Sequence, residues 1–209
     1  MSNNSKIDKG IPNEKARWWI ERAIQFLSIL APFILAFWLL IVQGENQRHY
    51  EREKLIQLLQ HIEAEITRNN QFIRDSTTLP NGMGTKIEML KDGRFISNLP
   101  QVRFKTVVWE TANLKDYFFL IRTDTYNEIE RLYGFFYEYN KHVNNFAQSI
   151  TSLKSLRASY KILPPDFQVE WKNAIYHSKS ANEYVDKIPS QSNDVVEIIH
   201  DNVSILRMQ

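Results

Sequence analysis

The most constraining feature of this chain is an uncharged apolar run over residues 23–42, AIQFLSILAPFILAFWLLIV, whose only polar side chains are Gln25 and Ser28. A helix of about 20 residues, rising roughly 1.5 Å per residue, spans the hydrocarbon core of a bilayer. The sequence after the run is typical of a water-soluble, mostly helical protein. The run therefore predicts one membrane-spanning helix that tethers a soluble domain.

Aromatic residues and one proline support this interpretation. Trp18 and Trp19 precede the run and Trp38 lies near its other end, and indole rings favour the membrane interface. Pro32 lies in the middle of the run, where a membrane helix tolerates it as a kink. We predict that these four residues anchor and shape the membrane helix.

Two other interpretations are weaker. The core helix of a soluble protein is normally shorter and carries a polar stripe, whereas this run is apolar all round. A cleaved signal peptide has an apolar region of about 7–15 residues, and no A-x-A cleavage site precedes Gln43. An uncleaved signal anchor in a single-pass protein of the cell membrane fits better.

The distribution of basic residues bears on membrane orientation. Five basic residues precede the run, namely Lys6, Lys9, Lys15, Arg17 and Arg22. Three follow it closely, namely Arg48, Arg52 and Lys54. This small excess favours a cytoplasmic N-terminus and a large domain outside the cytoplasm.

Composition excludes several classes of protein. Lys and Arg number 26 against 24 Asp and Glu, and the chain has no basic run with interleaved aromatics, so it gives no reason to expect nucleic-acid binding. Cysteine is absent, which excludes disulfides, iron–sulfur clusters and thiol catalysis. Only 6 glycines occur, which disfavours a turn-rich β fold.

The first soluble helix is predicted over residues 46–74, continuous or nearly so with the membrane helix. Its apolar stripe comprises Leu55, Leu59, Ile62, Ile66 and Ile73, and Asn69 fills the gap in this series. In a parallel coiled coil, Asn69 would set the register between two chains. In a bundle within one chain, it would instead hydrogen-bond inside the domain, for example to the backbone of a loop such as residues 75–100. We favour the second role because the stripe covers fewer than three heptads.

The remaining sequence predicts a flexible loop over residues 75–100, short helices at 106–112 and 114–121, and a long helix from Thr125 to about residue 156. Thr125 and Glu128 form a capping-box pattern at the start of the long helix.

Further helices are predicted over residues 166–187 and 195–206, separated at Pro189 by a polar turn over 190–194. The expected fold is all-α, with a polar tail (1–17), a transmembrane helix (18–43) and a soluble domain (44–209). This domain is predicted to be an antiparallel bundle of about four longer helices plus short pieces.

The sequence contains no recognisable catalytic, cofactor or metal constellation. Glu197 and His200 form one E-x-x-H unit, but di-iron bundles need two such units and two further glutamates. The pairs His61/Glu65 and Glu138/His142 have helical i,i+4 spacing and could share a metal, although such pairs are more often solvated neighbours. We therefore assign no catalytic residue and expect no cofactor. An enzyme whose site is assembled only in three dimensions stays a minor alternative.

Three short motifs resemble those of a loose group of small prokaryotic membrane-anchored proteins of uncharacterised function. In that group a single span leads into a helix with E-I-x-x-N, followed by F-x-T-x-x-W and a long helix with L-Y and a downstream Asn. The matches here are residues 65–69, residues 104–109, Leu132-Tyr133 and Asn140. The resemblance covers about half of the chain, from the span to the middle of the soluble domain. The resemblance implies an architecture and no activity, and it does not extend beyond Pro164.

These features favour a membrane-tethered interaction module: a scaffold, sensor or accessory subunit with the lipid bilayer and a second protein as partners. The alternative is a membrane-permeabilising effector of a toxin or phage-defence type. A pore favours small or polar residues along one face of a span, and this span offers only Ala23, Gln25, Ser28, Ala31 and Ala36. The interaction module therefore ranks first. The soluble domain is expected to be monomeric, with the oligomeric state of the span left open.

Overall fold

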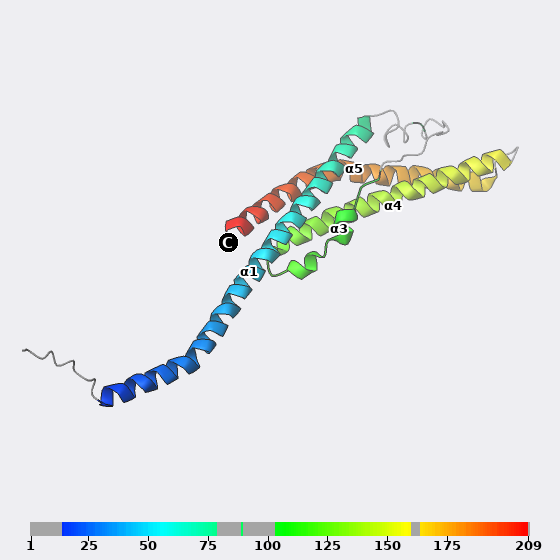
Figure 1. The fold of residues 1–209 in the computed structure, drawn as a ribbon. Helices are drawn as coiled ribbons and strands as arrows, with labels where there is room; N and C mark the ends of the chain where they lie inside the picture. Colours follow the sequence, from blue (N-terminus) through cyan, green and yellow to red (C-terminus); the bar gives the residue numbers. More distant parts are fainter. Residues whose placement is uncertain (1–13, 79–88, 90–102, 160–163, 209) are drawn as a thin grey trace, which may run out of the picture. The chain divides into compact units, whose positions relative to one another are not determined.

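A computed structural model describes residues 14–78, 89, 103–159 and 164–208 (Figure 1). The chain separates into two compact units, a first unit Met1–Tyr50 and a second unit Glu51–Gln209. The described residues form helices and no strands, so the predicted all-α class is confirmed. The elements are α1 (Glu14–Thr78), α3 (Val107–Thr111), the 3₁₀ helix η1 (Leu114–Tyr117), α4 (Thr123–Ser159) and α5 (Pro165–Met208).

The first unit contains the apolar part of α1. This helix is long and apolar enough to cross a membrane, and none of its most apolar stretch is buried. Trp18, Trp19 and Trp38 are all exposed, and the helix continues through Pro32. Helix α1 already begins at Glu14, inside the segment predicted as a polar tail, and the rest of that tail lies outside the described residues.

The second unit contains the other part of α1, where the character of the helix changes. The predicted stripe is buried, and Leu55, Leu59, Ile62 and Ile66 have no exposed surface. Helix α1 ends at Thr78, so the first residues of the predicted loop 75–100 are helical instead. Apart from the half-buried Met89, the rest of this loop lies outside the described residues.

The start of α4 differs from its prediction. The helix begins at Thr123, which places Thr125 in the first turn rather than at the cap. Thr125 is fully buried, and its hydroxyl accepts a hydrogen bond from Asn202 Nδ2 of α5 at 3.2 Å. Asp124 Oδ1 accepts the Thr125 N–H at 2.8 Å, and this bond holds the pKa of Asp124 below its usual range. Thr125 therefore does not cap α4 as the sequence pattern predicted; it packs against α5 instead.

Helix α5 overturns the predicted break at Pro189. It runs without interruption through the proline, so the separate helices over 166–187 and 195–206 and the turn over 190–194 were wrong. Proline removes one helical hydrogen bond and crowds the preceding turn. Here Ile188 and Val195 are fully buried and Ser192 is 1% exposed, so tertiary burial outweighs that cost. Figure 1 shows α5 changing direction near its middle, as expected for a proline kink.

Polar contacts show how the helices of the second unit are aligned. Between α4 and α5, Arg131 contacts Gln191 and His142 contacts His177. Between α1 and α5, Glu63 contacts His200 and Asn70 contacts Asn193. In both pairs of helices, the contact with the higher residue number on one helix has the lower residue number on the other.

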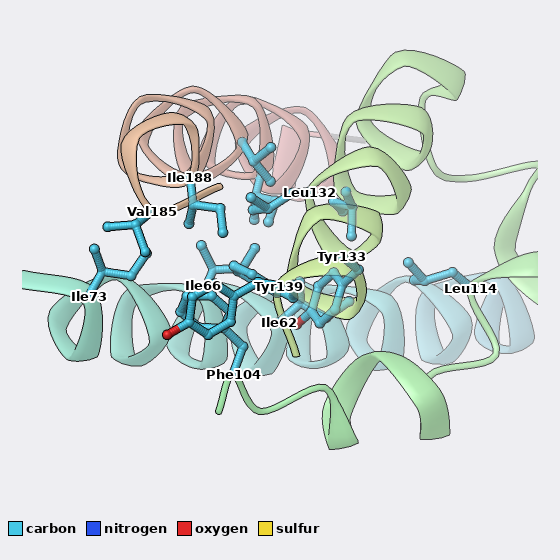
Figure 2. Close-up of a cluster of buried hydrophobic side chains, with 14 of the residues drawn as sticks. Ile62, Ile66, Ile73, Phe104, Leu114, Leu132, Tyr133, Tyr139, Val185 and Ile188 are labelled. Atoms are coloured by element: carbon cyan, nitrogen blue, oxygen red, sulfur yellow. The ribbon is translucent and has the colours of Figure 1, made fainter. Parts of the chain in front are cut away.

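The core of the second unit is apolar and rich in aromatic rings (Figure 2). Side chains from α1, α4 and α5 meet there with Phe104 and Leu114, which lie in the chain between α1 and α4. The Phe104 ring lies 4.8 Å from the Phe136 ring and 4.5 Å from the Tyr139 ring, measured between centroids. The long helices therefore pack around the Phe104 ring, which enters the core from a short extended segment, residues 103–105, whose Arg103 and Lys105 are exposed.

Candidate functional site

Two asparagine side chains hold the main chain of the extended segment. Asn69 Nδ2 of α1 donates to the Lys105 carbonyl at 2.8 Å, and the Lys105 N–H donates to Asn69 Oδ1 at 2.9 Å. Asn140 of α4 makes the same pair of bonds with Phe104, at 2.9 Å to its carbonyl and 2.8 Å from its N–H. We call Asn69, Asn140, Phe104 and Lys105 the asparagine clamp.

The geometry of an extended backbone explains the clamp. In an extended chain, the N–H and C=O groups of one residue point to one side and those of the next residue to the other side. The backbone groups of Phe104 therefore face α4, and those of Lys105 face α1. An asparagine side chain carries one carbonyl oxygen and one NH₂ group, and it can imitate a neighbouring strand. Aspartate at either position would offer acceptors only and would leave the backbone carbonyl without a donor.

A buried glutamate extends the network to α3 and α4. Glu65 is 6% exposed, and its Oε2 accepts the Val108 N–H at 3.1 Å while its Oε1 accepts the Tyr133 hydroxyl at 2.7 Å. Thr106, the N-cap residue of α3, makes no capping bond through its side chain. Glu65 therefore supplies, from another helix, the acceptor that the first turn of α3 needs.

Aromatic residues enclose this network. Tyr133 is fully buried, and burial together with the Glu65 carboxylate raises the pKa of its hydroxyl. The Trp109 ring stacks on the Tyr133 ring at 5.1 Å. Burial also raises the pKa of Tyr139, to about 12. Both hydroxyls are therefore protonated at neutral pH, and Tyr133 is a permanent donor to Glu65.

The network unites the residues of the three short motifs, namely residues 65–69, residues 104–109, Tyr133 and Asn140. Asn69 has no exposed surface and bonds within its own chain, to the backbone of Lys105. Sequence reasoning singled out Asn69 as a candidate site residue, whereas Glu65 and Asn140 were named only as motif positions and given no role. The available signal was the four-residue spacing of Glu65 and Asn69 on a face that is otherwise apolar.

A second polar cluster lies between α4 and α5. His142 Nδ1 and His177 Nδ1 are 3.0 Å apart, so one ring donates a proton to the other. Burial lowers the pKa of both imidazoles, and the charge of His142 lowers that of His177 further. Glu138 and Glu183 act on His142 in the opposite direction.

A cleft of about 500 Å³ lies between α1 and α5. Its lining includes the polar residues Thr67, Asn70, Gln71, Ser192, Asn193 and Glu197. Two buried atoms in this lining, Asn70 Oδ1 and Ser192 Oγ, have no hydrogen-bond partner among the described residues.

The remaining candidates from the sequence are not assembled into one centre. Glu65 accepts a hydrogen bond from Tyr133. Glu138 pairs with Lys141 at 3.1 Å, and His200 pairs with Glu63 at 2.8 Å. Within residues 14–78, 89, 103–159 and 164–208, no three His, Cys, Asp or Glu side chains are grouped to hold a metal ion. No family model, curated protein or solved structure matches this chain.

Proposed function

We propose that this protein is a membrane-tethered helical interaction module, with α1 as its single anchor and the second unit as an antiparallel bundle that serves as scaffold, sensor or accessory subunit. The observation that carries the proposal is the contrast within α1. Its first part is apolar on every side and wholly unburied, whereas its second part buries its stripe inside the chain. An apolar helix that the chain leaves uncovered needs lipid or another protein around it.

The chemistry of the second unit also favours binding over catalysis. The buried carboxylate of Glu65 and the amides of Asn69 and Asn140 are engaged in holding backbone and a tyrosine hydroxyl. A buried polar network whose groups are satisfied makes a packed domain rigid and specifies one arrangement. A rigid helical surface is suited to docking a second protein. We include in the proposal that the chain shares this architecture with the loose group it resembles.

Vesicle flotation with a dye-release readout tests the proposal against the permeabilising alternative. The purified full chain is expected to float with lipid vesicles without releasing an entrapped dye. Phe33→Arg/Leu35→Arg should abolish flotation, because each arginine at the centre of a span costs about 2.5–3.5 kcal/mol on the insertion scale. Gln57→Arg/Gln60→Arg adds the same charge at exposed positions of the second unit and should float normally. Dye release by the wild-type chain would favour the effector.

A reporter fusion tests the orientation. A periplasmic reporter placed after Gln209 is expected to be active, and a cytoplasmic reporter at the same site inactive, because basic residues are more numerous before the span. Moving that excess to the other side, by Arg17→Gln/Arg22→Gln with Gln43→Lys/Gln47→Lys, should shift activity towards the cytoplasmic reporter. A cytoplasmic signal from the unmodified chain would contradict the proposed orientation.

A further inference from the structure

The two imidazoles that meet between α4 and α5 carry one further inference. We propose that His142 and His177 bind a single divalent transition metal ion, of the zinc, nickel or copper kind, through their Nδ1 atoms. The ion would take the place of the proton that the two rings share. This site is separate from the asparagine clamp and does not depend on the function proposed above.

The distance between the two nitrogens suits such an ion. Zinc–imidazole bonds are about 2.0–2.1 Å, so two nitrogens on one ion lie roughly 3.3 Å apart at a tetrahedral angle and roughly 2.9 Å apart at a right angle. The observed separation of 3.0 Å lies between these values. The ring centroids are 5.3 Å apart, so the two Nδ1 atoms point almost directly at each other, and both rings would turn to face an ion beside the line that joins them. Imidazole prefers zinc, copper and nickel over magnesium, which sets the class of ion.

The surroundings of the pair also favour a cation. Glu138 and Glu183 act on His142, and Glu170 acts on His177, each as a negative charge. Lys141 is the opposing positive charge, and it pairs with Glu138 at 3.1 Å. Metal ligation requires neutral imidazole, and partial burial lowers the pKa of both rings towards that state.

The described part of the chain offers this ion two protein ligands and leaves further positions to solvent. Both histidines are half-buried, so water has access to one side of the pair. The tyrosine rings of residues 176 and 184 lie against His142 at 6.0 Å between centroids and shield another side. Because the two ligands come from different helices, a bound ion would join α4 to α5 and raise the stability of the folded state.

Thermal unfolding of the full chain in detergent micelles tests the proposal. After treatment with EDTA, the protein is heated at pH 7.5 in the presence of Zn²⁺, Ni²⁺ or Mg²⁺, and circular dichroism follows the loss of helix. Zn²⁺ and Ni²⁺ are expected to raise the midpoint temperature in a saturable way that EDTA reverses. Mg²⁺ is expected to have no effect. His142→Gln and His177→Gln should each abolish the Zn²⁺ shift.

His200→Gln is the matched control, because His200 pairs with Glu63 on a different pair of helices and its loss should leave the Zn²⁺ shift intact. Cu²⁺ electron paramagnetic resonance of the wild-type chain covers the case in which a glutamine variant fails to fold. One ion per chain with two coordinating imidazole nitrogens would support the site. A Zn²⁺ shift that persists in either glutamine variant, no shift in the wild type, or a copper spectrum with one nitrogen would overturn it.

Discussion

Asn69→Leu is expected to lower the free energy of unfolding by roughly 2–6 kcal/mol, because each buried polar group left without a partner costs about 1–3 kcal/mol. Leucine has the same branched arrangement of side-chain heavy atoms, so the change removes the polar groups and keeps the branching of the side chain. The N–H and the carbonyl of Lys105 would both lose their partner at a site where Asn69 has no exposed surface. Urea unfolding of the full chain in detergent micelles, followed by tryptophan fluorescence, measures the loss.

Asn140→Leu should have a similar effect through Phe104. The double variant should lose less than the sum of the two single losses, because either change already releases the same extended segment. Asn70→Leu is the matched control. Its Oδ1 has no partner among the residues that the structure describes, and its Nδ2 reaches Asn193 only at 3.4 Å, so the change should cost little. Equal losses for Asn69→Leu and Asn70→Leu would show that the clamp does not stabilise the domain.

The same variant separates the two roles considered for Asn69. An intrachain clamp predicts that Asn69→Leu changes stability and leaves the oligomeric state as it is. A register-setting asparagine in a coiled coil predicts that the substitution changes the order of association. Sedimentation of wild-type and variant chains in matched detergent distinguishes the outcomes, and a change of association order would refute the intrachain role.

Phe136→Ala is expected to cost about 3–5 kcal/mol, the usual range for emptying a fully buried phenylalanine site. Phe136 has no exposed surface, and its ring lies 4.8 Å from Phe104 and 5.2 Å from Tyr133 between centroids. The cavity would thus open beside the clamp, where the long helices prevent easy collapse. Phe146→Ala, on the same buried stripe, should have a similar cost.

The same urea experiment measures both variants. Phe119→Ala provides the control, since its side chain is 67% exposed and its removal should change the unfolding free energy little. A loss below about 1 kcal/mol at both Phe136 and Phe146 would place the stripe of α4 outside the stabilising core.

Helical periodicity accounts for the parts of the fold that could be predicted. The apolar run over residues 23–42 and the stripe from Leu55 to Ile73 follow from the spacing of neighbouring residues, and both lie in α1. The alignment of Phe136 and Phe146 on one face of α4 follows in the same way. Local spacing identifies which face of a helix avoids water, because transfer from water depends mainly on each side chain and its near neighbours.

Local rules were wrong where packing between distant segments outweighed them. A proline usually ends a helix, but α5 continues through Pro189 because Ile188 and Val195 are buried on either side. A Thr-x-x-Glu pattern usually marks a helix start, but Thr125 lies inside α4 and bonds to Asn202 of α5. In each case, packing between residues far apart in the sequence outweighed the local preference for a helix end.

The amino-acid sequence alone determined the all-helical class, the exposed apolar helix and the buried stripes, because these depend on side-chain polarity at a fixed helical spacing. Only the tertiary structure decided the candidate sites. Asn69 and Asn140 each bond to a backbone 36 residues away, and His142 meets His177 across 35 residues. Hydrogen bonds between such distant residues depend on how the helices align, and no local pattern encodes that alignment.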